Sequence, residues 1–304
     1  MPPLTHRYLD LARMEALRHV RLRPRGVAEG GLAGPHRSRH RGSGVEFADY
    51  REYSEGDDIR LVDWKVFART DRYYVRLYAA ERNLLTYLVV DKSGSMGFRG
   101  AARETESKLT HAARLAAALA YLVAREGDEV GLSLVDARLH EHVPVSGSWR
   151  HLGRLLDALG NANAEGRTDL GHCLEEVFRR VRRRGVLIVL SDFLDTAPRF
   201  WQSLDLFRRS HFDVMLFHVA QPEELELPEV AAARFVGTEG EAGQFVVEPD
   251  QIRMLYRERI RAHLGSVEAN ARARGCDWFL ARTDEDPYVF LQKCFLVRER
   301  QKHK

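Results

Sequence analysis

The chain has 304 residues, of which 44% are hydrophobic and 30% charged, and its formal net charge is +3. These values are ordinary for a globular protein and exclude collagen-like, low-complexity and wholly disordered chains. The longest strongly apolar run, residues 115–124, is about half of the ~20 residues that a membrane-spanning helix needs, so we expect no membrane span. No apolar stretch of a secretory signal follows the N-terminus, and we therefore expect a cytoplasmic protein.

Charge and cysteine content exclude further classes. Residues 1–44 have a net charge of +6, but arginine dominates the basic residues along the whole chain, so nucleic acid is not expected as a partner. The three cysteines, Cys173, Cys276 and Cys294, are widely separated and have no CxxC spacing, which argues against a disulfide framework and against a thiolate zinc site. We expect them to be small buried hydrophobic residues.

The first 83 residues contain two segments whose sequence patterns differ from that of the rest of the chain. Apolar positions at spacings of three and four predict an amphipathic helix over residues 4–20, and repeated glycine predicts a linker after it, so that residues 1–44 form an N-terminal helix and linker. Residues 45–83 alternate charged and aromatic positions and end in strand-like sequence. They predict a small β-rich domain held by Arg–carboxylate pairs.

Residues 84–300 are expected to form one α/β domain. Continuous apolar runs, typical of parallel strands buried on both faces, alternate with helical stretches, which predicts a Rossmann-like, doubly wound, mainly parallel sheet. Residues 108–125 are apolar nearly all round and should form a helix buried against this sheet. The expected strands are 84–90, 130–135, 186–190, 214–219 and 278–280, and the other expected helices are 152–159, 170–181, 200–207 and 252–273.

Oxygen-bearing side chains follow the first buried strand. Asp91, Ser93 and Ser95 alternate in a loop, so their oxygens can converge on one small cation. One carboxylate with hydroxyls and waters suits Mg²⁺, and ligands in α/β sheets bind at the carboxyl ends of strands. Thr168 at a helix start and Asp192 after another buried strand come from loops that a parallel sheet brings beside the first. The alternative is a polar turn in which Ser93 or Ser95 caps a helix.

Together, these five residues resemble the metal-ion-dependent adhesion site of von Willebrand factor A domains. The resemblance implies a von Willebrand factor A-like fold that binds Mg²⁺, with Mn²⁺ as the alternative ion. Ser93, Ser95 and Thr168 would contact the metal. Asp91 would act partly through water, and Asp192 would hold a metal-bound water. A carboxylate from a client protein would complete the sixth position.

Further motifs lie at residues 34–38, 44–53, 56–60, 63–65, 68–70, 127–132 and 282–287. They resemble the domain-of-unknown-function family fifty-eight, whose members are typically encoded beside MoxR-type AAA+ ATPases. The resemblance implies a non-enzymatic, Mg²⁺-dependent protein-binding module. It would act as adaptor or substrate-recognition partner of such an ATPase in protein complex assembly or activation. Many members carry membrane-spanning helices before this block, and that feature is not carried over to this chain.

Three other interpretations stay open. A metal-dependent hydrolase would use the Asp91 site to polarise a phosphoryl or acyl oxygen, but only Asp169 and Asp192 offer a general base, so we expect no enzyme. Nucleic-acid binding by the Arg-rich residues 18–41 would weaken steeply with salt. His140 and His142 could ligate a metal, although solvent-facing histidines on an edge strand explain the pattern better.

Overall fold

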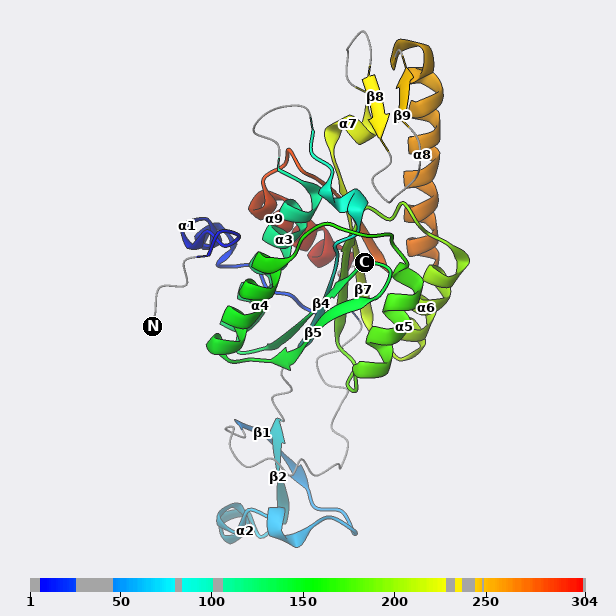
Figure 1. Cartoon of the computed structure of the whole chain (residues 1–304). Coiled ribbons are helices and arrows are strands. Elements are labelled where there is room, and N and C mark those ends of the chain that lie inside the picture. Colours follow the sequence, from blue (N-terminus) through cyan, green and yellow to red (C-terminus); the bar gives the residue numbers. More distant parts are fainter. Residues whose placement is uncertain are drawn as a thin grey trace. The chain divides into compact units, whose positions relative to one another are not determined.

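The computed structural model describes residues 6–25, 46–79, 84–100, 106–227, 233–236, 244–247 and 249–302. Two compact units divide the chain, one of residues 26–83 and one of residues 1–25 together with 84–304. The larger unit is built on a six-stranded sheet and the smaller one on a two-stranded sheet (Figure 1). Most of the predicted linker, from residue 26 to 44, lies outside the described residues.

The central sheet has the strand order β10-β7-β6-β3-β4-β5. All neighbouring strands pair in parallel except β5, which runs antiparallel to β4 at the edge and carries His140 and His142. The order reverses between β3 and β6, and the mainly parallel sheet confirms the predicted Rossmann-like, doubly wound architecture. The strands are β3 (Leu85–Asp91), β4 (Glu129–Val135), β5 (Leu139–Ser146), β6 (Val186–Ser191), β7 (Asp213–Ala220) and β10 (Asp277–Arg282).

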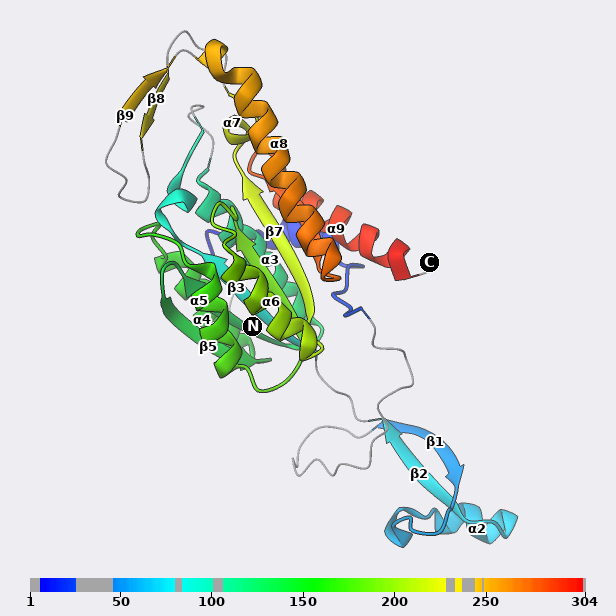
Figure 2. The ribbon, with the colours of Figure 1, turned by 90° about the vertical axis from the view of Figure 1, so that its right-hand side faces the viewer.

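Helices cover both faces of this sheet (Figures 1 and 2). Successive residues of a strand point to opposite faces, so Leu88 and Val90 pack under α3, α4 and α9, whereas Tyr87 and Val89 pack under α5, α6 and α8. Burial on both faces explains the continuous apolar runs. The helices are α3 (Lys108–Arg125), α4 (Trp149–Asn161), α5 (Leu170–Arg180), α6 (Pro198–Arg209), α7 (Pro222–Leu225), α8 (Pro249–Ala273) and α9 (Pro287–Lys302).

The N-terminal segment corrects one expectation. The predicted helix over residues 4–20 is wrong, because within residues 6–20, the described part of this stretch, only α1 (Leu11–Met14) and a short 3-10 helix (Glu15–Leu17) are helical. The Asp10 carboxylate accepts the first backbone N–H groups of α1 and so fixes its start. The apolar spacing therefore reports the packing of single residues, such as the buried Met14, against the core.

Helix α9 was not predicted. Its apolar residues lie on nearly every side, since Phe290 and Leu291 are buried whereas Leu296 and Val297 are exposed. Because these apolar residues do not form a single stripe along the helix, they do not recur at helical spacing in the sequence, and the pattern gives no helix signal. A short hairpin of β8 (Ala233–Val236) and β9 (Gln244–Val247) precedes α8. Among the described residues, no helix combines the length and the apolar character needed to cross a membrane.

The smaller unit pairs β1 (Glu46–Glu52) with the antiparallel β2 (Tyr74–Ala79). Between them lie a 3-10 helix (Ile59–Leu61) and α2 (Trp64–Thr70). Asp63 caps α2, the rings of Phe67 and Tyr73 stack with centroids 4.5 Å apart, and an ion pair joins Arg51 to Asp57. The Arg–carboxylate pairing predicted for this segment is thus present, although α2 was not predicted.

All three cysteines are buried and unpaired, as the sequence predicts. Burial raises the pKa of the Cys173 and Cys276 thiols to about 12, because the charged thiolate would lose its hydration. Thiols with so high a pKa are poor nucleophiles at neutral pH. They contribute packing to the core.

Candidate metal centre

The candidate metal residues gather at the sheet edge where the strand order reverses. Asp91 is the last residue of β3, and Asp192 directly follows β6. Because β3 and β6 are neighbours in the sheet, their carboxyl ends bring both carboxylates to one place. Thr168 reaches the same place from the loop before α5, and the backbone N–H of Gly94 donates to the carbonyl of Gly166, 2.8 Å away, which ties the two loops together.

Asp91 is fully buried and hydrogen-bonded through both carboxylate oxygens. Its Oδ1 accepts the backbone N–H of Ser93 at 2.8 Å, and its Oδ2 accepts the hydroxyls of Ser191 at 2.6 Å and Thr168 at 3.3 Å. Burial, with repulsion from Asp192 as the second cause, raises the pKa of Asp91 to about 7. The buried negative charge is therefore poorly compensated by the protein alone, which favours a cation nearby.

The hydroxyls of Ser93 and Ser95 lie side by side. A short 3-10 helix (Gly94–Gly97) turns the chain so that the two hydroxyl oxygens are 3.2 Å apart, and both residues are buried. Neighbouring oxygens around an octahedral Mg²⁺ with bonds of ~2.1 Å lie about 3 Å apart. The spacing of the two hydroxyls therefore fits adjacent positions on one such ion. Ser93 makes no side-chain capping bond to the 3-10 helix, which disfavours the simple polar turn.

Asp192 is buried beside a lysine. Its Oδ2 accepts a hydrogen bond from Lys108 Nζ at 2.7 Å, and its Oδ1 accepts the backbone N–H of Leu194 at 3.3 Å. Burial alone would raise the pKa of Asp192, but the adjacent Lys108 ammonium and the hydrogen bonds from Ser95 and Leu194 together outweigh burial and hold this pKa below its usual range. Phe193, the next residue, has a φ of +47°, an uncommon conformation for a residue other than glycine, and its kink lies between Asp192 and α6.

The structure thus brings all five predicted residues together at one place. Within the described residues, no three His, Cys, Asp or Glu side chains are grouped so that they could hold a metal ion. Any ion at this place would depend on hydroxyl oxygens together with the two aspartates. That donor set, all oxygen and mostly uncharged, fits a hard cation such as Mg²⁺ and is a poor match for zinc, which prefers nitrogen and sulfur.

Sequence reasoning missed three residues that shape the site. Ser191 donates to Asp91, and Lys108 joins Asp192 to Glu224, which lies on α7. For Lys108 a signal existed, because a lysine in the first turn of a helix opposes the helix dipole and so suggests a specific acidic partner. For Glu224 no local pattern could have identified the contact.

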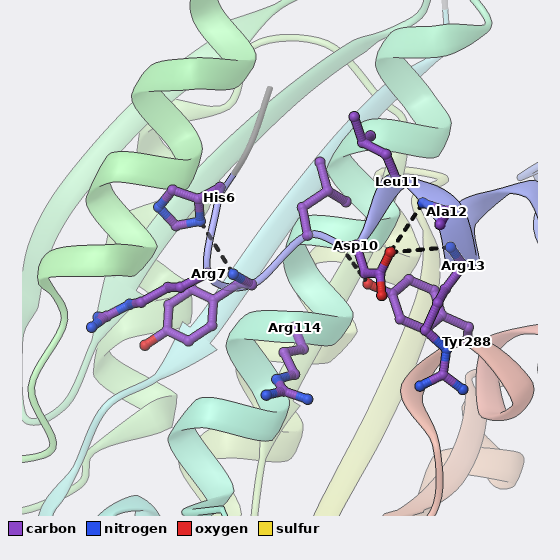
Figure 3. A pocket seen from close by; sticks show the side chains of 10 residues that line it. His6, Arg7, Asp10, Leu11, Ala12, Arg13, Arg114 and Tyr288 are labelled. Atoms are coloured by element: carbon purple, nitrogen blue, oxygen red, sulfur yellow. Dashed lines mark hydrogen bonds between the residues drawn. The ribbon is translucent and has the colours of Figure 1, made fainter. Parts of the chain in front are cut away.

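A separate concave region of about 490 Å³ lies beside the N-terminal segment (Figure 3). Residues 6–13 line it together with Arg114 of α3 and Tyr288 of α9. Its charged groups already have partners within the fold: Arg13 pairs with Asp286 and Arg114 with Glu106. We therefore assign no function to this region.

Behind the candidate site, His218 of β7 pairs in register with Ser191 and is 3% exposed. Burial lowers the pKa of His218 to about 3, so it stays neutral in the fold but becomes charged in the unfolded chain below pH ~6.5. The unfolded chain then binds the extra proton, and the stability supplied by this group is lost as the pH falls from ~6.5 towards 3.

His218→Phe is therefore expected to flatten the acid dependence of stability. The wild type should lose up to about 1.4 kcal/mol per pH unit more than the variant between pH 6 and 4. Urea unfolding at pH 4.5, 5.5 and 6.5 measures the difference, with the exposed His19→Gln as control. Equal slopes for wild type and His218→Phe would show that His218 is not held neutral.

Comparison with known proteins gives relatives over most of the chain. The family model "Protein of unknown function DUF58" matches residues 49–265. An uncharacterized protein of Mycobacterium tuberculosis is 32% identical over 275 residues, which are 89% of this chain and 85% of that protein.

Solved structures also resemble this chain. BatB, a conserved hypothetical protein from Bacteroides thetaiotaomicron, has 14% identity and a TM-score of 0.46, over 72% of this chain and 100% of that chain. The SpRpn10 VWA domain has 10% identity and a TM-score of 0.39, over 69% of this chain and 94% of that chain. By the extent of the family match and the identity to the mycobacterial relative, the chain belongs to the DUF58 family of proteins of unknown function.

Proposed function

We propose that this chain is a non-enzymatic, Mg²⁺-dependent protein-binding module that acts in the cytoplasm as adaptor or substrate-recognition partner of a MoxR-type AAA+ ATPase. The observation that carries the metal dependence is the convergence of Asp91, Ser93, Ser95, Thr168 and Asp192 at the sheet's reversal point. The ATPase partner rests on the resemblance of the sequence to its family. In this role the protein would assemble or activate a client protein complex.

The five residues of the candidate site would contribute to ion binding in two ways. Ser93, Ser95 and Thr168 would offer hydroxyl oxygens, while the two buried aspartates would supply the negative charge that retains a divalent cation. When bound, the ion would supply a strong electrostatic attraction for an Asp or Glu carboxylate of the client. Mn²⁺ would fit the same oxygen donors.

The metal-dependent hydrolase has less support. The two carboxylates that could serve as a general base are both engaged: Asp169 accepts the backbone N–H of His172 and so caps α5, and Asp192 holds Lys108. A general base needs a carboxylate within reach of the proton that it abstracts. Binding without turnover is the function that this arrangement supports better.

An affinity pull-down from native cell extract tests the proposal. Wild type with Mg²⁺, wild type with EDTA, Asp91→Ala and the exposed control Asp157→Ala are compared. We expect an AAA+ ATPase and a client protein with wild type in Mg²⁺ and with Asp157→Ala, and neither in the other two samples. Recovery of the same proteins from all four samples would contradict a metal-dependent contact.

A further inference from the structure

Lys108 is a fully buried cation that touches the candidate metal site. Its side chain is 0% exposed, and its Nζ lies 2.7 Å from Asp192 Oδ2 and 2.5 Å from Glu224 Oε1. An ammonium group without partners would be costly to bury, and here two carboxylates compensate it. Lys108 therefore links three segments: the start of α3, the loop after β6 and α7.

Glu224 is held firmly in this position. Its Oε2 accepts the backbone N–H of Gln221 at 2.9 Å, and its backbone carbonyl accepts the Tyr256 hydroxyl of α8 at 2.7 Å. Gln221 is itself anchored, because its Nε2 donates to the carbonyl of Glu106 at 2.6 Å and its Oε1 accepts the Thr283 hydroxyl at 2.6 Å. The Glu224 carboxylate is therefore a fixed counter-charge for Lys108.

The position of Lys108 gives no benefit to its own helix. It is the first residue of α3, where the positive end of the helix dipole repels a cation, and Ser107 already caps the helix. Its two carboxylate contacts are what fix the side chain there. One of those carboxylates, Asp192, also belongs to the donor set of the candidate metal site, so the ammonium and a metal ion would share it.

We propose that Lys108 and Glu224 set the metal affinity of this site, Lys108 as an internal cation that competes for Asp192 and Glu224 as the charge that moderates this competition. The inference rests on the proposed function, since it takes the ion to lie among Asp91, Asp192 and the hydroxyls. The positive charge of Lys108, in contact with Asp192, repels a divalent ion, and the negative charge of Glu224, one contact farther away, attracts it more weakly. Removing the two charges therefore shifts the metal affinity in opposite directions.

Titration of the full-length protein with Mn²⁺, followed by electron paramagnetic resonance, measures these shifts. Lys108→Met, which keeps the length of the side chain, is expected to bind Mn²⁺ at least about tenfold more tightly than wild type. Glu224→Gln is expected to bind it about threefold to tenfold more weakly. Lys293→Met removes an exposed lysine of α9 that pairs with Glu285, and the Mn²⁺ affinity of this variant should stay within about twofold of wild type.

The opposite signs separate this role from a purely structural one. If Lys108→Met and Glu224→Gln both weaken Mn²⁺ binding, or both leave it unchanged, Lys108 only stabilises the fold and the inference is wrong. If Lys108→Met does not fold, as judged by circular dichroism, the Glu224→Gln affinity decides alone. If wild type and Asp91→Asn bind Mn²⁺ equally, the metal site itself is absent, and the proposed function fails instead.

Discussion

Asp91→Asn is expected to abolish Mg²⁺ binding and yet leave the metal-free protein at least as stable as the wild type. The asparagine keeps the shape of the side chain and one oxygen that accepts hydrogen bonds, but it removes a negative charge that is fully buried beside Asp192. A buried carboxylate whose pKa is raised to about 7 costs folding free energy at neutral pH, because the ionised form has lost its hydration. The same charge is what a divalent ion needs.

Thermal unfolding with and without Mg²⁺ measures both effects. At a metal concentration about 100 times the dissociation constant, binding adds about 2.7 kcal/mol to the stability of the wild type. This gain should raise its Tm by roughly 5 to 10 °C, whereas Asp91→Asn should show no rise. Asp195→Asn is the matched control, because this carboxylate lies in the loop after β6 but is exposed. A wild type whose Tm does not respond to Mg²⁺ or Mn²⁺ would contradict the metal centre.

The central fold could be predicted because the burial of each strand and helix is visible in its own stretch of sequence. Strands buried on both faces, such as Val186–Ser191, must be apolar throughout, and helices packed on them are apolar as well, as in α3. The ends of the chain were predicted poorly for the opposite reason. In α9 the apolar residues face the core, a neighbouring helix and solvent, and in α1 the capping Asp10 limits the helix in a way that spacing does not reveal.

The gathering of the five candidate residues could be predicted from topology. Asp91 and Asp192 each follow a strand, and parallel neighbours necessarily end at one edge. The residues that adjust the site could not be predicted, because Lys108 meets Asp192 across 84 residues and Glu224 across 116. Such contacts depend on how the helices are placed on the sheet, which no local pattern in this sequence specifies.

Arg298→Ala is expected to cause the largest loss of stability. At the strand ends opposite to the candidate site, Arg298 of α9 pairs with Asp213 and Asp277, which begin β7 and β10. All three are nearly fully buried, and Arg25 also pairs with Asp277 at 2.5 Å. Removing Arg298 leaves two buried carboxylates with one side-chain cation, and breaking such a buried pair typically costs about 3 to 5 kcal/mol.

Urea unfolding of the full chain at neutral pH measures this loss of free energy. Thermal unfolding should show a fall in Tm of about 10 °C. Lys293→Ala is the control, because Lys293 is exposed and its pair with the partly buried Glu285 should contribute less than about 1 kcal/mol. Adding Asp213→Asn and Asp277→Asn to Arg298→Met should recover much of the stability, since both buried carboxylates are then neutral and Arg25, which loses its pair with Asp277, is partly exposed to water. If Arg298→Ala costs less than about 1 kcal/mol, the cluster does not hold α9 and the N-terminal segment to the sheet, and packing of Phe290 and Leu291 must do so instead.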